Sequence, residues 1–365
     1  MEMTSRGFDL AVIGGGPAGT SAAITAARME VSVALFDRSD FPRQKVCGEF
    51  VSAESLELLR DLLREHPTAG EQLRNAPVIA RVRIIAGKHV VETPVQPPAL
   101  SIPRTVLDLL LWQAAGQSRV TAHSRCDVLT LEGCGPFQLS TSVGQFTAKA
   151  VVLCAGRWSR FSDARLVPSG PKWIGLKAHY RECNPPQSTD LYFFNHGYCG
   201  VQPVGDCAVN VCAMVRSDIA ATLEQVLGLA PQLARRVAGW KPLTVPVTTA
   251  PLLYREPELL RGNVLLAGDA AAFIDPFAGD GISLALRTGR AAAQSLHAFF
   301  RGQASLEKAA QNYRVTYEKE FAPLISAAAR VRRLHSLPEF VWPVAVHVLR
   351  IPGVLPYMIR KTRSQ

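Results

Sequence analysis

A glycine-rich segment near the start of the chain, Gly14-Gly15-Gly16-Pro17-Ala18-Gly19, follows the pattern G-x-G-x-x-G. Between a strand and a helix, the first glycine permits a tight turn, the second lets a pyrophosphate approach the backbone, and the third lets helix and strand pack closely. The free N–H groups at the helix start then face the phosphates. Asp37 follows Gly19 by 18 residues, close to the spacing of about 20 for a carboxylate that binds ribose hydroxyls. The segment therefore predicts a dinucleotide site.

A second motif lies far downstream, where an apolar run ends in Gly268-Asp269 and is followed by Pro276 and by Gly279-Asp280-Gly281-Ile282. A strand that ends in Gly-Asp places a carboxylate where it can accept a hydrogen bond from a ribityl hydroxyl. The glycine-rich helix start can direct backbone N–H groups at the pyrimidine edge of a flavin, where a reduced flavin carries negative charge. The two motifs together predict that the dinucleotide is FAD.

The elements that must position these residues are buried strands and helices. Apolar runs at 8–13 and 31–37 predict two strands joined by a helix at 17–29. Further helices are expected at 53–64, 106–115 and 281–299, and further buried strands at 150–154 and 264–267. Turn residues and alternation predict a hairpin at 81–93, a connector at 94–98, short strands at 120–148 and a strand-rich segment at 172–215.

This order of elements predicts an α/β fold in which a Rossmann-like FAD-binding domain is interleaved with a substrate domain built on an antiparallel sheet, followed by C-terminal helices. We assign residues 1–75, 100–165 and 255–300 to the FAD-binding domain. Residues 76–99 and 166–254 form the expected substrate domain, and residues 301–365 the C-terminal helical segment.

The formal net charge of +10 is concentrated near the C-terminus, where residues 325–365 carry seven Lys or Arg side chains against a single acid, Glu339. Because these charges lie among apolar residues, they favour contact with an anionic membrane surface or a partner over nucleic acid binding. A helical lid packed on the flavin domain is the alternative interpretation of residues 340–359.

Cysteine usage and hydropathy restrict the class of protein further. The eight cysteines (Cys47, Cys126, Cys134, Cys154, Cys183, Cys199, Cys207 and Cys212) include no C-x-x-C pair, and no histidine cluster accompanies them. We therefore expect no metal site and no disulfide framework, as is typical of a cytoplasmic protein. No apolar run approaches the roughly 18 to 20 residues that span a bilayer.

With both motifs in place, the chain resembles, over residues 7–300, the FAD-dependent family that includes para-hydroxybenzoate hydroxylase, flavin-dependent halogenases and geranylgeranyl reductases. The resemblance implies that the loop at 41–49, with Arg43 and Lys45-Val46-Cys47-Gly48-Glu49, approaches the flavin. Its Lys-x-Cys-Gly-Glu part is most similar to geranylgeranyl reductases, and Pro-Arg…Gly-Glu is also similar to halogenases. Arg104 matches a family arginine that contacts the cofactor, and Arg38 follows the ribose-binding Asp37.

The chain departs from the family pattern at two places. Where the family has Ala-Asp-Gly, this chain has Cys154-Ala155-Gly156-Arg157, so the acid is missing at Ala155, although Ala155 and Gly156 still fall beside the cofactor. The W-x-W-x-I-P of halogenases is missing, and the P-x-x-Y-x-W-x-F-P of geranylgeranyl reductases is matched at Tyr198 and Pro203 alone. Because the chain has one G-x-G-x-x-G, NAD(P)H is expected as a transient reductant without a domain of its own.

No catalytic residue is assigned from the sequence, and four side chains are candidates. Cys47 lies in the loop expected beside the flavin, although a small turn residue without reactivity is the plainer interpretation. His196, Tyr198 and Gln202 lie on strands expected to cover the flavin and could orient substrate or act as an acid. His179, on an apolar strand, is expected to be a core residue.

The resemblance implies an enzyme whose bound FAD is reduced by NAD(P)H and acts on a hydrophobic organic molecule in a dry pocket. Two chemistries remain open: reduction of a C=C bond in a prenyl- or polyketide-like compound, which the loop motif favours, and hydroxylation of an aromatic or polyketide-like ring with O2. A hypothesis of another class is a lipid- or prenyl-binding protein on the same fold without redox function.

Overall fold

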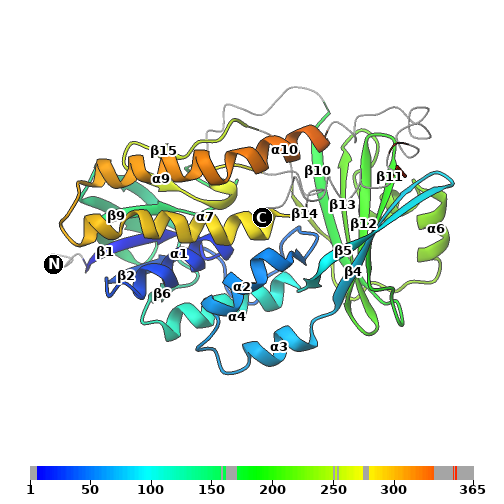
Figure 1. The fold of residues 1–365 in the computed structure, drawn as a ribbon, viewed down its shortest axis with the longest axis horizontal. Coiled ribbons are helices and arrows are strands. Elements are labelled where there is room, and N and C mark those ends of the chain that lie inside the picture. Colours follow the sequence, from blue (N-terminus) through cyan, green and yellow to red (C-terminus); the bar gives the residue numbers. More distant parts are fainter. Residues whose placement is uncertain are drawn as a thin grey trace.

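The computed structural model describes residues 6–157, 159–161, 171–249, 251–252, 255–273, 279–332, 348 and 350–351. Within these residues the strands form two sheets that lie side by side, with helices packed on the first (Figure 1). The predicted α/β fold with a Rossmann-like domain is confirmed, whereas the domain limits remain a proposal. Most of the C-terminal basic segment lies outside the described residues, so its membrane contact stays a prediction. None of the described helices is long and apolar enough to cross a bilayer.

The first sheet has a parallel centre. Its strands follow the order β15 (Leu260–Arg261), β16 (Val264–Leu266), β9 (Gly144–Leu153), β1 (Arg6–Ile13), β2 (Val33–Phe36) and β6 (Thr121–His123), with β8 (Phe137–Thr141) and β7 (Val128–Glu132) continuing from β9. Strands β16, β9, β1, β2 and β6 are mutually parallel. Parallel strands are covered on both faces, which explains the continuous apolar runs in the sequence. Their carboxyl ends meet at one edge of the sheet, which brings Gly14, Asp37 and Gly268 together.

Helices cover this sheet and extend the chain beyond it. They are α1 (Pro17–Ala27), α2 (Ala53–Leu62), α3 (Ala69–Asn75), α4 (Arg104–Gln117), α7 (Gly281–Ser295), α8 (His297–Phe300), α9 (Leu306–Glu320) and α10 (Ala322–Arg332), with the 3-10 turn η2 (Gly268–Ala270). The helix predicted at 281–299 is thus divided, because α7 ends at Ser295 and α8 begins at His297. The Tyr313 hydroxyl donates to the Leu266 carbonyl at 2.7 Å and fastens α9 to the sheet.

The second sheet follows the order β14 (Val247–Thr249), β10 (Trp173–Tyr180), β13 (Ala208–Arg216), β12 (Gly197–Gly205), β11 (Ser188–Phe194), β4 (Val78–Ala86), β5 (His89–Ser101) and β3 (Phe50–Val51). Alternate residues of these strands face opposite ways. Ile174, Leu176 and Ala178 belong to a core shared with α5 (Leu223–Leu227) and α6 (Pro231–Val237) on the outer face. Figure 1 shows α6 on the side turned away from the first sheet. The intervening residues face inward.

The connector predicted at 94–98 is wrong, because these residues lie within strand β5. Proline interrupts a ladder of backbone hydrogen bonds and therefore reads as a breaker in sequence. Here the pairing with β4 steps from Ala99 opposite Ile79 to Pro94 opposite Arg81, so the residues between form an irregularity that accommodates the prolines.

The contact between α1 and α7 sets how closely the nucleotide domain packs. A Cβ atom added at Gly289 of α7 would collide with the Ala18 carbonyl of α1. We expect Gly289→Ala to lower the free energy of unfolding by about 1–3 kcal/mol, because the two helices must move apart. Gly116→Ala in α4, where nothing lies within 4 Å of an added Cβ, is the control and should be neutral or stabilising by up to about 1 kcal/mol. Urea-induced unfolding measures both, and equal stabilities would contradict the prediction.

Candidate functional site

A cavity of about 680 Å³ lies between the carboxyl edge of the first sheet and the inner face of the second. It runs from Asp37 and Asp127 past the glycine turn to Asp269, and on to Leu191 and Gly200 of the second sheet. The predicted cofactor residues that line it are Gly14, Gly16, Pro17, Ala18, Asp37, Arg38, Arg43, Cys47, Gly48, Arg104, Ala155, Gly156, Gly268, Asp269, Gly279, Gly281 and Ile282. Gly19 lies behind the turn, and Pro276 lies outside the described residues.

The glycine turn has the geometry that a pyrophosphate site requires. Gly14 has φ of +109°, and an added Cβ would collide with the Cys154 carbonyl of β9. A Cβ at Gly19 would collide with the Gly14 carbonyl, so helix and turn pack at backbone distance. Helix α1 begins at Pro17 after Gly16, and its N-terminal N–H groups meet the cavity, where they favour an anion.

Asp37 stands at the end of β2, as the spacing predicts, and its carboxylate is nearly buried. It accepts hydrogen bonds from Gly15 N at 2.7 Å, from Ser39 N at 2.8 Å and from Arg43 Nη1 at 2.6 Å. A carboxylate offers about four acceptor sites, so one remains for a ribose hydroxyl. These residues fit a dinucleotide whose ribose lies beside β2.

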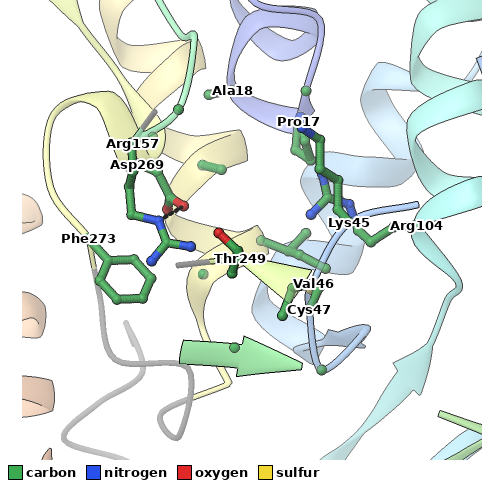
Figure 2. A pocket seen from close by; sticks show the side chains of 18 of the residues that line it. Pro17, Ala18, Lys45, Val46, Cys47, Arg104, Arg157, Thr249, Asp269 and Phe273 are labelled. Carbon is green, nitrogen blue, oxygen red and sulfur yellow. Dashed lines mark ion pairs between the residues drawn. The ribbon is translucent and has the colours of Figure 1, made fainter. Parts of the chain in front are cut away.

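Asp269 lies across the cavity at the end of β16, within η2. Its carboxylate is paired with Arg157 Nε at 3.5 Å, and the Arg157 guanidinium lies 3.8 Å from the centre of the Phe273 ring (Figure 2). In the sequence, Arg157 stands out only as part of the departure from the family pattern. The structure gives it a position opposite Lys45, Val46 and Cys47 (Figure 2).

The loop at 41–49 is fastened to the second sheet by a buried ionic cluster, which we call the Glu49 cluster (Gln44, Glu49, Lys177 and His179). Lys177 Nζ lies 2.5 Å from Glu49 Oε1 and 2.9 Å from Gln44 Oε1, and His179 Nε2 lies 2.8 Å from Glu49 Oε2. Arg104 N also donates to Glu49 Oε1 at 2.8 Å. Burial alone would raise the pKa of Glu49, but the His179 hydrogen bond and the Lys177 charge outweigh it and hold that pKa below its ordinary value.

His179 is buried, as expected of a core residue, and its ring also binds a buried carboxylate, which the sequence did not indicate. Lys177 was not among the candidate residues predicted from the sequence. A signal was present in β10, where apolar Ile174, Leu176 and Ala178 alternate with Gly175, Lys177 and His179. That alternation indicates one apolar and one polar face, although it does not name the partner.

Cys47 borders the cavity next to this cluster. Its carbonyl accepts from Asn210 Nδ2 at 3.0 Å, and its Sγ accepts from Glu49 N at 3.3 Å. The Arg104 guanidinium donates two hydrogen bonds to the Asp108 carboxylate, from Nε to Oδ1 at 2.7 Å and from Nη2 to Oδ2 at 2.9 Å. Burial lowers the pKa of nearby Lys45, and the positive Arg43 lowers it further.

The other catalytic candidates separate into two groups. Tyr198 and Gln202 line the cavity together with Cys47. The Gln202 amide is held by Ser101 Oγ at 2.7 Å and Thr189 Oγ1 at 3.0 Å. His196 occupies the turn between β11 and β12, where its Nδ1 lies 3.3 Å from Arg216 Nη1, and it is not among the residues that line the cavity. Among the described residues, no group of His, Cys, Asp and Glu side chains could hold a metal ion.

Two protein families match the sequence. Residues 8–189 match the family described as pyridine nucleotide-disulphide oxidoreductase, and residues 254–330 match the FAD binding domain. Among curated proteins, digeranylgeranylglycerophospholipid reductase 1 of Methanopyrus kandleri is 27% identical over 375 residues, covering 97% of this chain and 96% of that protein. Menaquinone reductase of Mycolicibacterium smegmatis is 25% identical over 393 residues, covering 96% and 90%.

Solved structures share the fold at lower identity. A flavin-dependent brominase has a TM-score of 0.78 at 20% identity and covers 98% of this chain and 93% of its own. A geranylgeranyl bacteriochlorophyll reductase-like protein of Thermoplasma acidophilum has a TM-score of 0.75 at 19% identity and covers 98% and 96%. The same fold therefore occurs in proteins with reductase and with halogenase names.

The position of Asp269 leads to a prediction about cofactor affinity. We expect Asp269→Ala to weaken FAD binding about ten- to a hundredfold, because a charge-assisted hydrogen bond to the ribityl chain is worth about 1.5–3 kcal/mol. Titration of the apoprotein with FAD, followed by flavin fluorescence, measures the change. Asp218→Ala, which removes a surface carboxylate paired with Arg216, is the control. Unchanged affinity in Asp269→Ala would overturn the assigned role.

The Glu49 cluster leads to a prediction about stability. We expect Lys177→Met to lower the free energy of unfolding by about 3–5 kcal/mol, because Glu49 is left as a buried charge without its main countercharge. The double variant Glu49→Gln/Lys177→Met should recover most of that loss, since neither charge remains. Equal stability of the single and double variants would contradict this prediction, and the Glu49→Gln single variant completes the cycle that measures the interaction.

The same cluster predicts how stability responds to acid. The pKa of Glu49 is lower in the folded chain than its ordinary 4.5. The ion pairs therefore contribute stability above about pH 4.5, and this contribution is lost as the pH falls toward the lower folded pKa. We expect the stability advantage of the wild type over Glu49→Gln to shrink over that interval. Urea unfolding at a series of pH values checks this, and a constant difference would contradict it.

Proposed function

We propose that this chain, an FAD-dependent oxidoreductase, draws electrons from NAD(P)H and reduces C=C bonds of an apolar, prenyl- or polyketide-like molecule. When bound, FAD supplies the two-electron redox chemistry. The observation that carries the proposal is the shape of one cavity, which joins a dinucleotide site at the edge of the first sheet to an apolar floor on the second.

The floor next to the cofactor site is built from side chains that favour an apolar ligand. Val82, Ile84, Leu191, Tyr198 and Met214 line it, and all come from the inward face of β4, β11, β12 and β13. A pocket of this composition excludes water from the reacting bond and gives an apolar chain the contacts that it lacks in water.

The cofactor residues divide the binding work between the two ends of the dinucleotide. Asp37 and the start of α1 would hold the ribose and the pyrophosphate, and Asp269 with the helix start at Gly281 would hold the flavin end. The Glu49 cluster fixes the loop with Lys45 and Cys47 at the cavity wall. NAD(P)H would reach the flavin transiently, since the sequence contains a single G-x-G-x-x-G.

The relatives support the reductase reading, because a digeranylgeranylglycerophospholipid reductase and a menaquinone reductase match over nearly the whole chain. The alternative of a carrier protein without redox function is not supported, because Asp37, Asp269 and the glycine turn all line the cavity. Hydroxylation with O2 remains the competing chemistry, and the experiment below separates the two.

We expect NADPH to bleach the flavin absorbance of the purified protein under anaerobic conditions. Addition of a prenyl lipid such as geranylgeraniol should then restore the absorbance without air, and mass spectrometry should find product that has gained two hydrogen atoms for each double bond reduced. An oxygen electrode provides the counter-test in air. Product that has gained an oxygen atom and forms in proportion to O2 consumed would overturn the reductase proposal in favour of a monooxygenase.

A further inference from the structure

Gly200 occupies the middle of strand β12, where glycine has no conformational task. Its φ is not in the left-handed region, and an added Cβ would meet Leu191 Cδ2 at 3.4 Å and the Cys212 carbonyl at 3.6 Å, which are ordinary contacts. The register shift of this strand lies elsewhere, between Pro203 and Gly205. Glycine within a strand costs stability and often marks a place where a ligand or another backbone approaches closely.

At two neighbouring glycines of the same sheet, by contrast, surrounding protein atoms leave no room for a side chain. A Cβ at Gly175 would press against Val46 Cγ1 at 2.9 Å, so the loop at 41–49 packs on that backbone. A Cβ at Gly197 would lie 2.6 Å from the Met214 carbonyl. Among the residues that the structure describes, no group comes closer than 3.4 Å to a Cβ added at Gly200, which lines the cavity.

The registers of the strands place Gly200 within an inward-facing row of the second sheet. Lys177, Cys212, Gly200, Leu191 and Ile84 form one row across β10, β13, β12, β11 and β4. The Glu49 cluster covers the row at Lys177. Next to the loop at 41–49, the absence of a side chain at Gly200 leaves a shallow depression in the cavity floor. Leu191 and Ile84 border this depression on the side away from the loop.

The adjacent row of residues supplies a polar group, the Gln202 amide, at the edge of this depression. Gln202 lies two residues along β12 and also lines the cavity. The Gln202 side-chain amide donates one hydrogen bond to Ser101 Oγ and accepts one from Thr189 Oγ1. One amide N–H and one carbonyl lone pair therefore remain for a ligand.

We infer that Gly200 and Gln202 form a subsite for a flat, unsaturated ring that bears a carbonyl or hydroxyl oxygen. The ring lies against the β12 backbone at Gly200 with Leu191 and Ile84 beside it, and its oxygen meets the Gln202 amide. This deepens the proposed function and rests on it, because it makes the substrate a ring-bearing apolar molecule, quinone-like or polyketide-like, and not an isoprenoid chain alone.

The test measures binding to the FAD-loaded, oxidised protein without any reductant, through the change in the flavin absorbance spectrum. The ring probe is a naphthoquinone methylated at both free quinone carbons, so that thiols cannot add to it, and the chain probe is geranylgeraniol. We expect Gly200→Leu to weaken the ring probe about tenfold or more, because the new side chain fills the shallow depression. Geranylgeraniol, being narrower, should change by less than about threefold.

Two further variants separate the subsite from general damage. Gly205→Leu, in the same strand but away from the cavity, is the matched control and should bind both probes as the wild type does. Gln202→Leu should weaken the ring probe about three- to tenfold through the lost hydrogen bond and leave the chain probe unchanged. If Gly200→Leu fails to retain FAD, then Gly200→Ala and Gln202→Leu carry the test.

Wild-type affinity for the ring probe in Gly200→Leu and in Gln202→Leu would overturn the inference. So would a wild-type protein that binds geranylgeraniol but not the naphthoquinone, or neither. These outcomes differ from a failure of the proposed function, which would appear as a flavin that NADPH does not reduce or as product that has gained an oxygen atom from O2.

Discussion

The buried carboxylate of Glu49 joins two parts of the chain that are far apart in sequence, and the geometry of the cavity depends on it. A carboxylate inside a protein is tolerated only when countercharges and hydrogen bonds replace water. Lys177 and His179 of β10 provide the countercharge and the hydrogen bonds. These contacts set the distance between the loop at 41–49 and the second sheet. Because the loop also forms the wall beside the cofactor site, the same ion pairs set the distance between the two halves of the cavity.

Much of the candidate cofactor site could be predicted from the sequence because its residues belong to local motifs. The glycine turn, Asp37 at the end of the next strand and the Gly268-Asp269 pair each carry their meaning within a short stretch, and all of them line the cavity or pack behind it. The parallel sheet follows from the same apolar runs, since strands covered on both faces leave a continuous hydrophobic signal.

The remaining features depend on contacts between distant residues, which a local pattern does not record. Glu49 and Lys177 are separated by 128 positions. The Lys-x-Cys-Gly-Glu motif places Glu49 in the correct loop, yet no residue near it in the sequence indicates that Lys177 is its partner. The prediction for residues 94–98 failed for the opposite reason. The prolines in this stretch indicated a connector, whereas pairing with strand β4 holds these residues in an irregular part of β5.

The two sheets contribute to the cavity in physically different ways. The first presents strand ends, so its contribution is made of backbone N–H groups, glycine turns and two carboxylates whose positions are set by parallel pairing. The second presents a face, so its contribution is made of alternate side chains. A substitution such as one at Gly200 or Leu191 reshapes the floor without moving a strand end, because the outward neighbours still pack on α5 and α6. A fold arranged in this way can keep its cofactor site while its substrate changes, which gives a physical reason why proteins with reductase and halogenase names share it.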